Sequence, residues 1–258
     1  MLPLSAHTFN PIGRIHSCFK EKFGIPRQPG LVPDARARVE MLPPYDEAEA
    51  FRGLTEFSHI WILFVFHAVP AGRWRPTVRP PRLGGNRRLG VFATRSTFRP
   101  NPIGQSVVRL DGIDQVDGRL ALRLSGVDLL DGTPVLDIKP YLPYADALPQ
   151  ARGGFAGEAP QGLGPVRYAA RAEAALEAAA RRHGYDLRTL VADLLAHDPR
   201  PAYRREDTPG RTYGMRIEDL NIEWQVAERA ITVTAVTEVG TKGSTKGDSE
   251  KNGAGEMD

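Results

Sequence analysis

Three Asp-Gly pairs punctuate the middle of the chain, and they limit the folds that its first half can adopt. The pairs are Asp111-Gly112, Asp117-Gly118 and Asp131-Gly132. Glycine accepts a positive φ and aspartate caps its own turn, so such pairs favour tight turns between antiparallel strands. Many short strands at this spacing favour a barrel or a sandwich over a nucleotide-binding βαβ sheet.

Residues 9–140 consist of short extended segments with little helical periodicity. Each segment is rich in β-branched or aromatic residues or alternates in polarity. The expected strands are Ile12–His16, Arg38–Leu42, His59–Phe66, Leu89–Ala93, Gly104–Leu110, Arg119–Leu124 and Val135–Lys139. One short helix is expected over Asp46–Arg52. The predicted fold class is mainly β.

The second half of the chain has a different composition. Between Gly153 and Pro165 the sequence shifts to Gly, Ala, Pro and Gln, which bury little surface. We therefore expect a β domain over 1–150, a linker over 151–164, a small α+β domain over 165–239 and a disordered tail over 240–258. The expected elements of the second domain are helices Tyr168–His183 and Leu187–His197 and strands Thr212–Ile217 and Ile231–Val239.

Arginine is distributed unevenly along the chain. No acidic residue occurs between Glu56 and Asp111. The arginines inside this interval are Arg73, Arg75, Arg79, Arg82, Arg87, Arg88, Arg95, Arg99 and Arg109. A GC-rich genome explains some of this arginine, since Arg outnumbers Lys throughout, but it does not explain the missing carboxylates. The net charge is only +3, yet such a local excess of positive charge suits phosphate contacts.

Several classes of site and location are disfavoured. The longest apolar run, Ile60–Phe66, is far shorter than the roughly 20 residues of a membrane-spanning helix, and the N-terminus lacks the order of a signal peptide. A single cysteine, Cys18, cannot form an internal disulfide and excludes a cysteine-rich metal site. The histidines His16, His59 and His67 lack zinc-site spacing. We expect a cytoplasmic protein with no metal and no membrane partner.

Two proline-fixed loops carry the most informative sequence. They are Trp74–Asn86 and Gly90–Gly104, and they present guanidinium groups on backbone that loses little entropy on binding. Within the second loop, the Asn101 amide oxygen and the carbonyl beside Pro102 could together accept both protons of an exocyclic amine. The competing interpretation is an Asn-Pro turn that only bends the chain.

Three further groups of residues leave alternatives open. The carboxylates of Asp128–Pro134 suit a cationic sulfonium or a ribose, and Lys139 and Tyr141 suit an acceptor base, but turn chemistry and an ion pair also explain both segments. The aromatic residues Phe66, Trp74, Phe92 and Phe98 are able to stack on an extruded base or to fill the core. From these residues alone the chain has a surface suited to RNA and no named reaction.

Five stretches together resemble the TrmO family of tRNA adenine-N6 methyltransferases, also called TsaA or YaeB-like. They are Phe23–Gly30, Phe57–Trp61, Trp74–Asn86, Ala93–Gly104 and Asp128–Tyr144. The similarity spans residues 8–239, including Asp198–Tyr203. It implies a single-sheet, barrel-like β domain, a homodimer and S-adenosylmethionine as donor. The implied acceptor is N6 of threonylcarbamoyladenosine at position 37, beside the anticodon of threonine tRNA.

The resemblance also implies roles for individual residues by motif position. The implied cofactor contacts are Arg27, Gln28, Pro29, Phe66, His67, Arg95, Gln105, Asp128, Leu129, Leu130 and Asp131. Gln105 stands where relatives carry a hydrophobic residue, so a contact through its backbone alone is an alternative. We expect Asn101 and Pro102 to accept the amine protons, and Lys139 and Tyr141 to contact the threonylcarbamoyl group. The arginines expected to meet tRNA phosphates are Arg79, Arg82, Arg87, Arg88 and Arg99.

Two other functions remain open at this level. One is a non-catalytic RNA-binding module without a cofactor pocket, which calorimetry with S-adenosylmethionine would distinguish. The other is an enzyme acting on a small molecule or a methyltransferase acting on another adenine. For the second domain we expect a role in holding the anticodon arm, because it carries Arg200, Arg204, Arg205 and Arg211.

Overall fold

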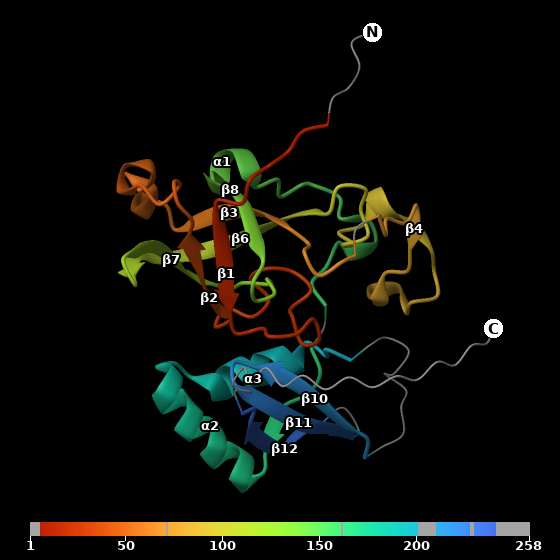
Figure 1. Ribbon diagram of the computed structural model, residues 1–258. Coiled ribbons are helices and arrows are strands. Elements are labelled where there is room, and N and C mark those ends of the chain that lie inside the picture. The colour runs from red at the N-terminus through yellow and green to blue at the C-terminus, as the bar shows by residue number, and fades with distance from the viewer. Residues whose placement is uncertain (1–5, 71, 161, 201–209, 228–229, 241–258) are drawn as a thin grey trace, which may run out of the picture.

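The computed structural model describes residues 6–70, 72–160, 162–200, 210–227 and 230–240 (Figure 1). Three expectations from the sequence lie wholly or largely outside these residues: the disorder of the tail over 240–258, of which only residue 240 is described, the contribution of Arg204 and Arg205 to RNA binding, and positions 201–203 of the C-terminal motif.

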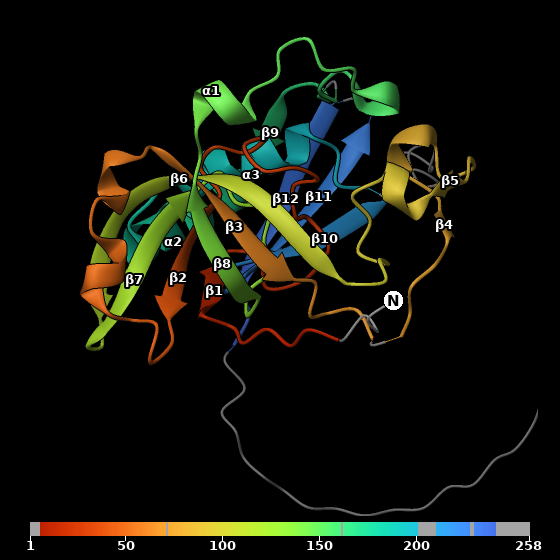
Figure 2. The same ribbon diagram turned by 90° about the horizontal axis from the view of Figure 1, so that it is seen from above.

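Six strands of the first half hydrogen-bond into one closed barrel, in the order β1-β2-β7-β6-β3-β8 (Figure 2). The bounds are β1 Gly13–Ser17, β2 Arg36–Met41, β3 His59–Val65, β6 Ile103–Val116, β7 Arg119–Ser125 and β8 Pro134–Pro140. The pairs Gly13 with Val135 and Arg14 with Pro134 join β1 to β8. The prediction of a mainly β chain is confirmed.

Alternation of side chains along the strands fills the barrel. On β3 the side chains of Ile60, Ile62 and Phe64 are buried, whereas the residues between them are partly exposed. This period of two is the expected result of a pleated strand with one face on the core. The buried side chains of the barrel form a core that continues into the second half of the chain.

The Asp-Gly pairs behave in two ways. Asp117 and Gly118, with φ values of 52° and 77°, form the two-residue turn between β6 and β7, as the sequence predicts. Asp111-Gly112 does not form a turn, so the prediction that a strand ends at Leu110 is wrong. Strand β6 continues to Val116, because Gly112 accommodates a bulge and the pairing with β7 resumes beyond it.

Residues 73–99, here called the arginine arm, extend from the barrel between β3 and β6 (Figure 2). The arm contains β4 Thr77–Val78, β5 Leu89–Gly90 and the 3₁₀ turns Pro81–Leu83 and Val91–Ala93. A strand over Leu89–Ala93 was expected, but it stops at Gly90. The N–H and the hydroxyl of Thr94 both donate to the Val91 carbonyl oxygen, which closes a turn instead.

Short helical segments occupy other loops of the first half. The segment expected to be a helix over Asp46–Arg52 is only a 3₁₀ turn over Ala48–Phe51. A second 3₁₀ turn, Leu54–Glu56, and helix α1, Pro143–Asp146, have no counterpart in the predictions. All three are three or four residues long, too short for a helical period to be visible in the sequence.

The second half combines a four-stranded sheet with two helices (Figure 1). The sheet order is β10-β11-β12-β9, and the bounds are β9 Val166–Tyr168, β10 Thr212–Ile217, β11 Leu220–Ala227 and β12 Ala230–Glu238. The helices are α2 Ala170–His183 and α3 Leu187–Ala196. The predicted helices and two of the strands are confirmed within about two residues, and Gly184 ends α2 in the left-handed region. Strands β9 and β11 were not predicted.

The two halves contact each other next to the end of β1. Phe19 forms an isolated bridge with Ile217, and the N–H of Glu218 donates to the Cys18 carbonyl oxygen over 2.8 Å. The ring of Phe23 stacks on Trp224 with centroids 5.9 Å apart. The division into domains at 151–164 remains our proposal. Among the described residues, no helix combines the length and the apolar character needed to cross a bilayer.

Candidate active site

A cavity of about 760 Å³ opens at the end of the barrel where β3 stops and β6 begins. This volume is within the usual range for small-molecule pockets, roughly 300–1000 Å³. Five segments that are distant in sequence line it: 22–28, 64–70, 94–99, 103–106 and 128–133. The lining includes nine of the expected cofactor residues, namely Arg27, Gln28, Phe66, His67, Arg95, Gln105, Asp128, Leu129 and Leu130.

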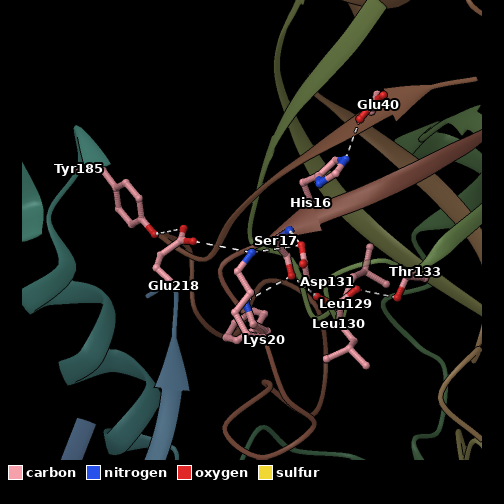
Figure 3. A network of polar contacts seen from close by, with 11 residues as sticks. His16, Ser17, Lys20, Glu40, Leu129, Leu130, Asp131, Thr133, Tyr185 and Glu218 are labelled. Carbon is pink, nitrogen blue, oxygen red and sulfur yellow. Dashed lines mark hydrogen bonds and ion pairs between the residues drawn. The ribbon is translucent and has the colours of Figure 1, made fainter. Parts of the chain in front are cut away.

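The turn over 128–133 is held in place by β1 (Figure 3). The hydroxyl of Ser17 donates to the Leu129 carbonyl oxygen over 2.7 Å, and its N–H donates to Asp131 Oδ1 over 2.9 Å. The ammonium of Lys20 lies 3.2 Å from the same Asp131 oxygen. Asp131 therefore fixes the turn, and neither it nor Pro29 lines the cavity.

The same lysine connects this turn to the second half of the chain (Figure 3). Lys20 Nζ lies 3.9 Å from Glu218 Oε2, and the Tyr185 hydroxyl donates to Glu218 Oε1 over 2.8 Å. These contacts connect the loop that precedes helix α3 to the turn over 128–133, which forms part of the cavity wall.

Asp128 is the carboxylate that faces the cavity. The hydroxyl of Ser106 donates to its Oδ1 over 2.6 Å. Burial raises the pKa of Asp128 to about 6, against the opposing effects of the Ser106 hydrogen bond and of the more distant Arg95 charge. No ion pair joins Asp128 to a cation within the described part of the chain, so the ionised carboxylate lacks a counter-charge that a positively charged ligand would supply.

His67 is a second titratable group on the cavity wall. Burial, and then the positive charge of Lys22, lower the pKa of His67. Its Nδ1 lies 3.4 Å from the Thr133 hydroxyl. The imidazole is therefore neutral near pH 7, and one ring nitrogen is a proton acceptor.

Aromatic rings form the apolar part of the wall. Phe64 and Phe66 meet edge to face with centroids 5.1 Å apart. They pass close above Gly104, where a Cβ would overlap the Phe64 ring and lie 2.9 Å from Cζ of Phe66. Glycine at 104 is therefore what lets these rings lie against β6 and shape an apolar floor.

Asn101 and Pro102 lie at the entrance of the β6 strand, next to the cavity residue Ile103. The Pro102 carbonyl oxygen already accepts the N–H of Phe66 over 2.8 Å, and the Asn101 carbonyl oxygen accepts the N–H of Ile103 over 2.7 Å. The side chain of Asn101 is exposed. The Pro102 oxygen keeps one lone pair, so this pair of residues is still able to accept protons from an amine.

Lys139 and Tyr141 lie outside the cavity. In the β3–β8 register Lys139 is opposite Trp61, three residues before the first cavity residue of β3, Phe64. Lys139 forms an ion pair of 3.0 Å with Asp137, and Tyr141 packs beside Trp61 with centroids 6.0 Å apart. Strand β8 leads away from the 128–133 turn, so closeness in sequence does not bring these side chains to the cavity.

A larger cleft of about 2040 Å³ adjoins the cavity and shares part of its wall, including Arg27, Gln28 and Arg95. The guanidinium of Arg95 donates to the Gln28 side chain across this shared wall. The arginine arm forms one side of the cleft, and residues 153–160, 162–163 and 194–200 form the other. Among the described residues, seven arginines line the cleft, Arg27, Arg75, Arg79, Arg82, Arg88, Arg95 and Arg200, against two carboxylates, Glu158 and Asp198.

The arginines expected to bind tRNA are not equivalent. Arg79, Arg82 and Arg88 line the cleft, whereas Arg87 is exposed outside it. Arg99 lines the smaller cavity, and its guanidinium donates to the carbonyl oxygens of Val91 (3.3 Å) and Thr94 (2.7 Å). Arg99 therefore stabilises the arm rather than pointing freely outward.

Sequence reasoning missed several residues of the site. Ser106 supports Asp128, and Thr133 contacts His67. A signal existed for Ser106, because the alternation of β6 places a serine among buried positions. From the second half, Arg200, which the sequence did offer for RNA binding, lines the cleft and forms a buried ion pair of 2.7 Å with Asp198. In the described ranges, no group of three His, Cys, Asp or Glu side chains lies close enough to hold a metal ion.

Comparisons with known proteins agree with this arrangement. Residues 14–147 match the tRNA-methyltransferase O N-terminal domain, and residues 162–239 match the TrmO C-terminal domain. The chain belongs to the tRNA-methyltransferase O family. The resemblance inferred from the sequence motifs is thereby confirmed.

Similar proteins cover both halves of this family member. A tRNA (adenine(37)-N6)-methyltransferase of Escherichia coli (strain K12) is 49% identical over 233 residues, 90% of this chain and 99% of that protein. A protein of Pseudomonas aeruginosa (strain PAO1), whose assigned name includes S-adenosylmethionine-dependent methyltransferase, is 56% identical over 84% of this chain and 92% of its own. A crystal structure of TrmO from P. aeruginosa matches with a TM-score of 0.77 and 46% identity, covering 92% of this chain and all of that one.

Proposed function

We propose that this protein transfers a methyl group from S-adenosylmethionine to N6 of threonylcarbamoyladenosine at position 37 of threonine tRNA. The observation that carries the proposal is that a cavity with a partly buried carboxylate shares a wall with a cleft that is lined, among the described residues, by seven arginines. An enzyme that methylates a base of a polyanion needs both surfaces side by side. Relatives named as tRNA adenine(37)-N6 methyltransferases support the position of the acceptor.

The residues of the smaller cavity fit S-adenosylmethionine, the donor of this family. Asp128 offers a partly buried negative charge to a cationic group, and Arg27 and Arg95 suit a carboxylate. The rings of Phe64 and Phe66 offer an apolar surface to a purine. When bound, the donor supplies a methyl group on a cationic sulfur that leaves readily.

Positioning of the acceptor nitrogen is the task left to the protein. Asn101, through its side-chain oxygen, and Pro102, through the free lone pair of its carbonyl oxygen, would hold the amine at the rim of the cavity. Neutral His67 and the ionised form of Asp128 are the groups in the cavity able to take up the proton that the amine loses. Alignment and exclusion of water then account for most of the rate enhancement.

The cleft would hold the tRNA. Arg79, Arg82 and Arg88 suit phosphate contacts, and Arg200 places the second half of the chain on the same surface. We further propose a homodimer, as the family resemblance implies; light scattering of the purified protein tests this. Lys139 and Tyr141 lie away from the cavity, so Lys139→Met and Tyr141→Phe variants that both still prefer threonylcarbamoylated tRNA would remove these two residues from the mechanism.

Mass spectrometry of nucleosides tests the reaction directly. Purified enzyme and S-adenosylmethionine are incubated with threonine tRNA that carries or lacks the threonylcarbamoyl group, and with another tRNA that carries it. We expect methylated threonylcarbamoyladenosine only from modified threonine tRNA. Methylation of the unmodified tRNA would assign the activity to another adenine, and the absence of any methyl transfer would refute the proposal.

A variant of Asn101 tests the positioning step. Asn101→Ala should lower kcat by about 10- to 100-fold and leave the affinity for S-adenosylmethionine unchanged, since the side chain is not part of the cofactor wall. Full activity of this variant with unchanged cofactor affinity would exclude the amide from the reaction.

A further inference from the structure

Phe92 stands out among the aromatic residues of the arginine arm. Its side chain is 75% exposed, yet it lies on the wall of the arginine-lined cleft. The neighbouring residue Val91 is 1% exposed and anchors the 3₁₀ turn that carries the ring. An exposed phenylalanine next to a buried anchor is a costly arrangement in water, because the apolar ring stays hydrated.

The surrounding hydrogen bonds keep this ring out of the core. Thr94 donates to the Val91 carbonyl oxygen through both its N–H and its hydroxyl. Arg99 donates to the carbonyl oxygens of Val91 and Thr94, and its guanidinium carbon lies 5.7 Å from the Phe92 centroid. All of these hydrogen bonds are made by residues flanking Phe92 to backbone carbonyl oxygens, so they fix the turn that carries the ring and leave most of the ring surface exposed.

The other aromatic residues near the site are either packed against neighbouring groups or lie outside the cleft. Phe66 packs against Phe64 in the smaller cavity. Phe98 is half-buried, with the Arg75 guanidinium 5.0 Å from its centroid. Trp74 is 51% exposed but does not line the cleft. Of the four aromatics that the sequence offered for base stacking, only Phe92 is both largely exposed and within the cleft in the described structure.

We propose that Phe92 is a stacking platform for a nucleobase of the RNA substrate. The inference rests on the proposed tRNA function and adds to it a residue that binds bases rather than phosphates. An exposed aromatic ring among arginines suits an unpaired base on a sugar-phosphate backbone, since the arginines hold the phosphates and the ring stacks on a base of any sequence. An acidic protein partner would use the arginines but has no need of the ring.

The experiment compares Phe92→Leu, Phe92→Trp and the control Tyr144→Leu. Leucine keeps an apolar side chain without a π face, and tryptophan restores stacking. Tyr144 is 87% exposed and lies outside both cavities, so its substitution reports any unspecific effect of removing a surface aromatic ring. The measurements are affinity for tRNA across a salt series, affinity for polyphosphate, and affinity for S-adenosylmethionine.

We expect Phe92→Leu to weaken tRNA binding by about 10-fold, as loss of one stacked base implies, and to leave polyphosphate and donor affinities unchanged. The salt slope of tRNA binding should stay the same, because no charge is removed. Phe92→Trp should bind tRNA with an affinity within about twofold of that of the protein without a substitution, because tryptophan also stacks on a base.

Three results would overturn the inference: unchanged tRNA affinity in Phe92→Leu, an equal loss of polyphosphate affinity, or an equal loss of tRNA affinity in Tyr144→Leu. Failure of the proposed function looks different. In that case the unmodified protein would transfer no methyl group to tRNA, whatever the behaviour of Phe92.

Discussion

The arginine arm and the outer surface of the barrel are both rich in arginine, but they use it differently. On the barrel, Arg109 pairs with Asp111 over 2.7 Å and Arg123 pairs with Asp114 over 2.8 Å, while Arg119 pairs with Glu40. In the described part of the arm, no arginine forms an ion pair with a carboxylate. The difference teaches that a run of arginines keeps its charges unpaired, as phosphate binding requires, only where the fold places no carboxylates beside it.

The sequence showed only part of this difference between the arm and the barrel. The interval without acidic residues runs past the arm and includes Arg109, whose partner Asp111 is the first acidic residue beyond it. Pairing depends on neighbours in space, and strands β6 and β2 place Asp111, Asp114 and Glu40 beside the barrel arginines. Among the described residues, no strand places a carboxylate in an ion pair with an arginine of the arm.

The largest expected effect tests this contrast directly. The triple variant Arg79→Gln, Arg82→Gln, Arg88→Gln should weaken tRNA binding by about 100-fold at low salt and reduce the slope of log K against log salt by about 2 to 3. The matched control, Arg109→Gln, Arg119→Gln, Arg123→Gln, should change the affinity less than about threefold, because those cations are already paired. Filter binding over a salt series measures both. Equal losses of tRNA affinity in the two triple variants would contradict the difference between the arginines of the arm and those of the barrel.

The second prediction concerns Asp128, a barrel carboxylate that lacks an ion pair among the described residues. Its pKa is raised in the folded protein, to about 6 from 3.8, so the folded state binds this proton more tightly than the unfolded state does. Stability therefore falls as pH rises from about 4 to 6, by roughly 2–3 kcal/mol from this group. Asp128→Asn should be more stable than the unmodified protein at pH 7 and similar to it at pH 4, as thermal unfolding at the two pH values will show.

The affinity for S-adenosylmethionine should change over the same pH range as the stability, but it should rise where the stability falls. A cationic ligand prefers ionised Asp128, so S-adenosylmethionine should bind more weakly at pH 5 than at pH 7, and Asp128→Asn should abolish this dependence. Calorimetry across this range measures it. A pH dependence that survives in Asp128→Asn would assign the titration to another group, such as His67.

Arg95 connects the arginine arm to the smaller cavity, since it belongs to the arm, lines the cavity and lowers the pKa of Asp128. Arg95→Gln should weaken donor binding by about 10-fold and shift the pH midpoint upward. Arg88→Gln, a change on the same arm but outside the smaller cavity, is the control and should leave donor affinity intact. If both variants bind the donor equally well, the arm and the cavity act independently.

The smallest effect is expected on the barrel surface. Arg123→Gln removes an exposed ion pair with Asp114, and such pairs contribute at most about 1 kcal/mol. Thermal unfolding should change by no more than a few degrees at low salt and even less at high salt. A large loss of stability would show that paired arginines are structural supports of the barrel rather than a solvated surface.

Local signals in the sequence were sufficient for much of the fold. The Asp117-Gly118 turn depends on the backbone freedom of two adjacent residues, and α2 ends where Gly184 accepts the left-handed region. The nine expected cofactor residues that line the cavity came from family motifs rather than from physics alone. Ser106 was missed because its role depends on Asp128, a neighbour 22 residues away in sequence.

By itself, the sequence determined a mainly β chain, the helices of its second half and a cationic segment free of carboxylates, because these follow from periodicity, turn chemistry and charge order along the chain. Only the tertiary structure decided that Asp111-Gly112 is a bulge, that Asp131 is bound to β1, and that Lys139 lies away from the cavity. The physical reason is register: strand pairing and the partners that burial brings together are set by contacts between distant segments.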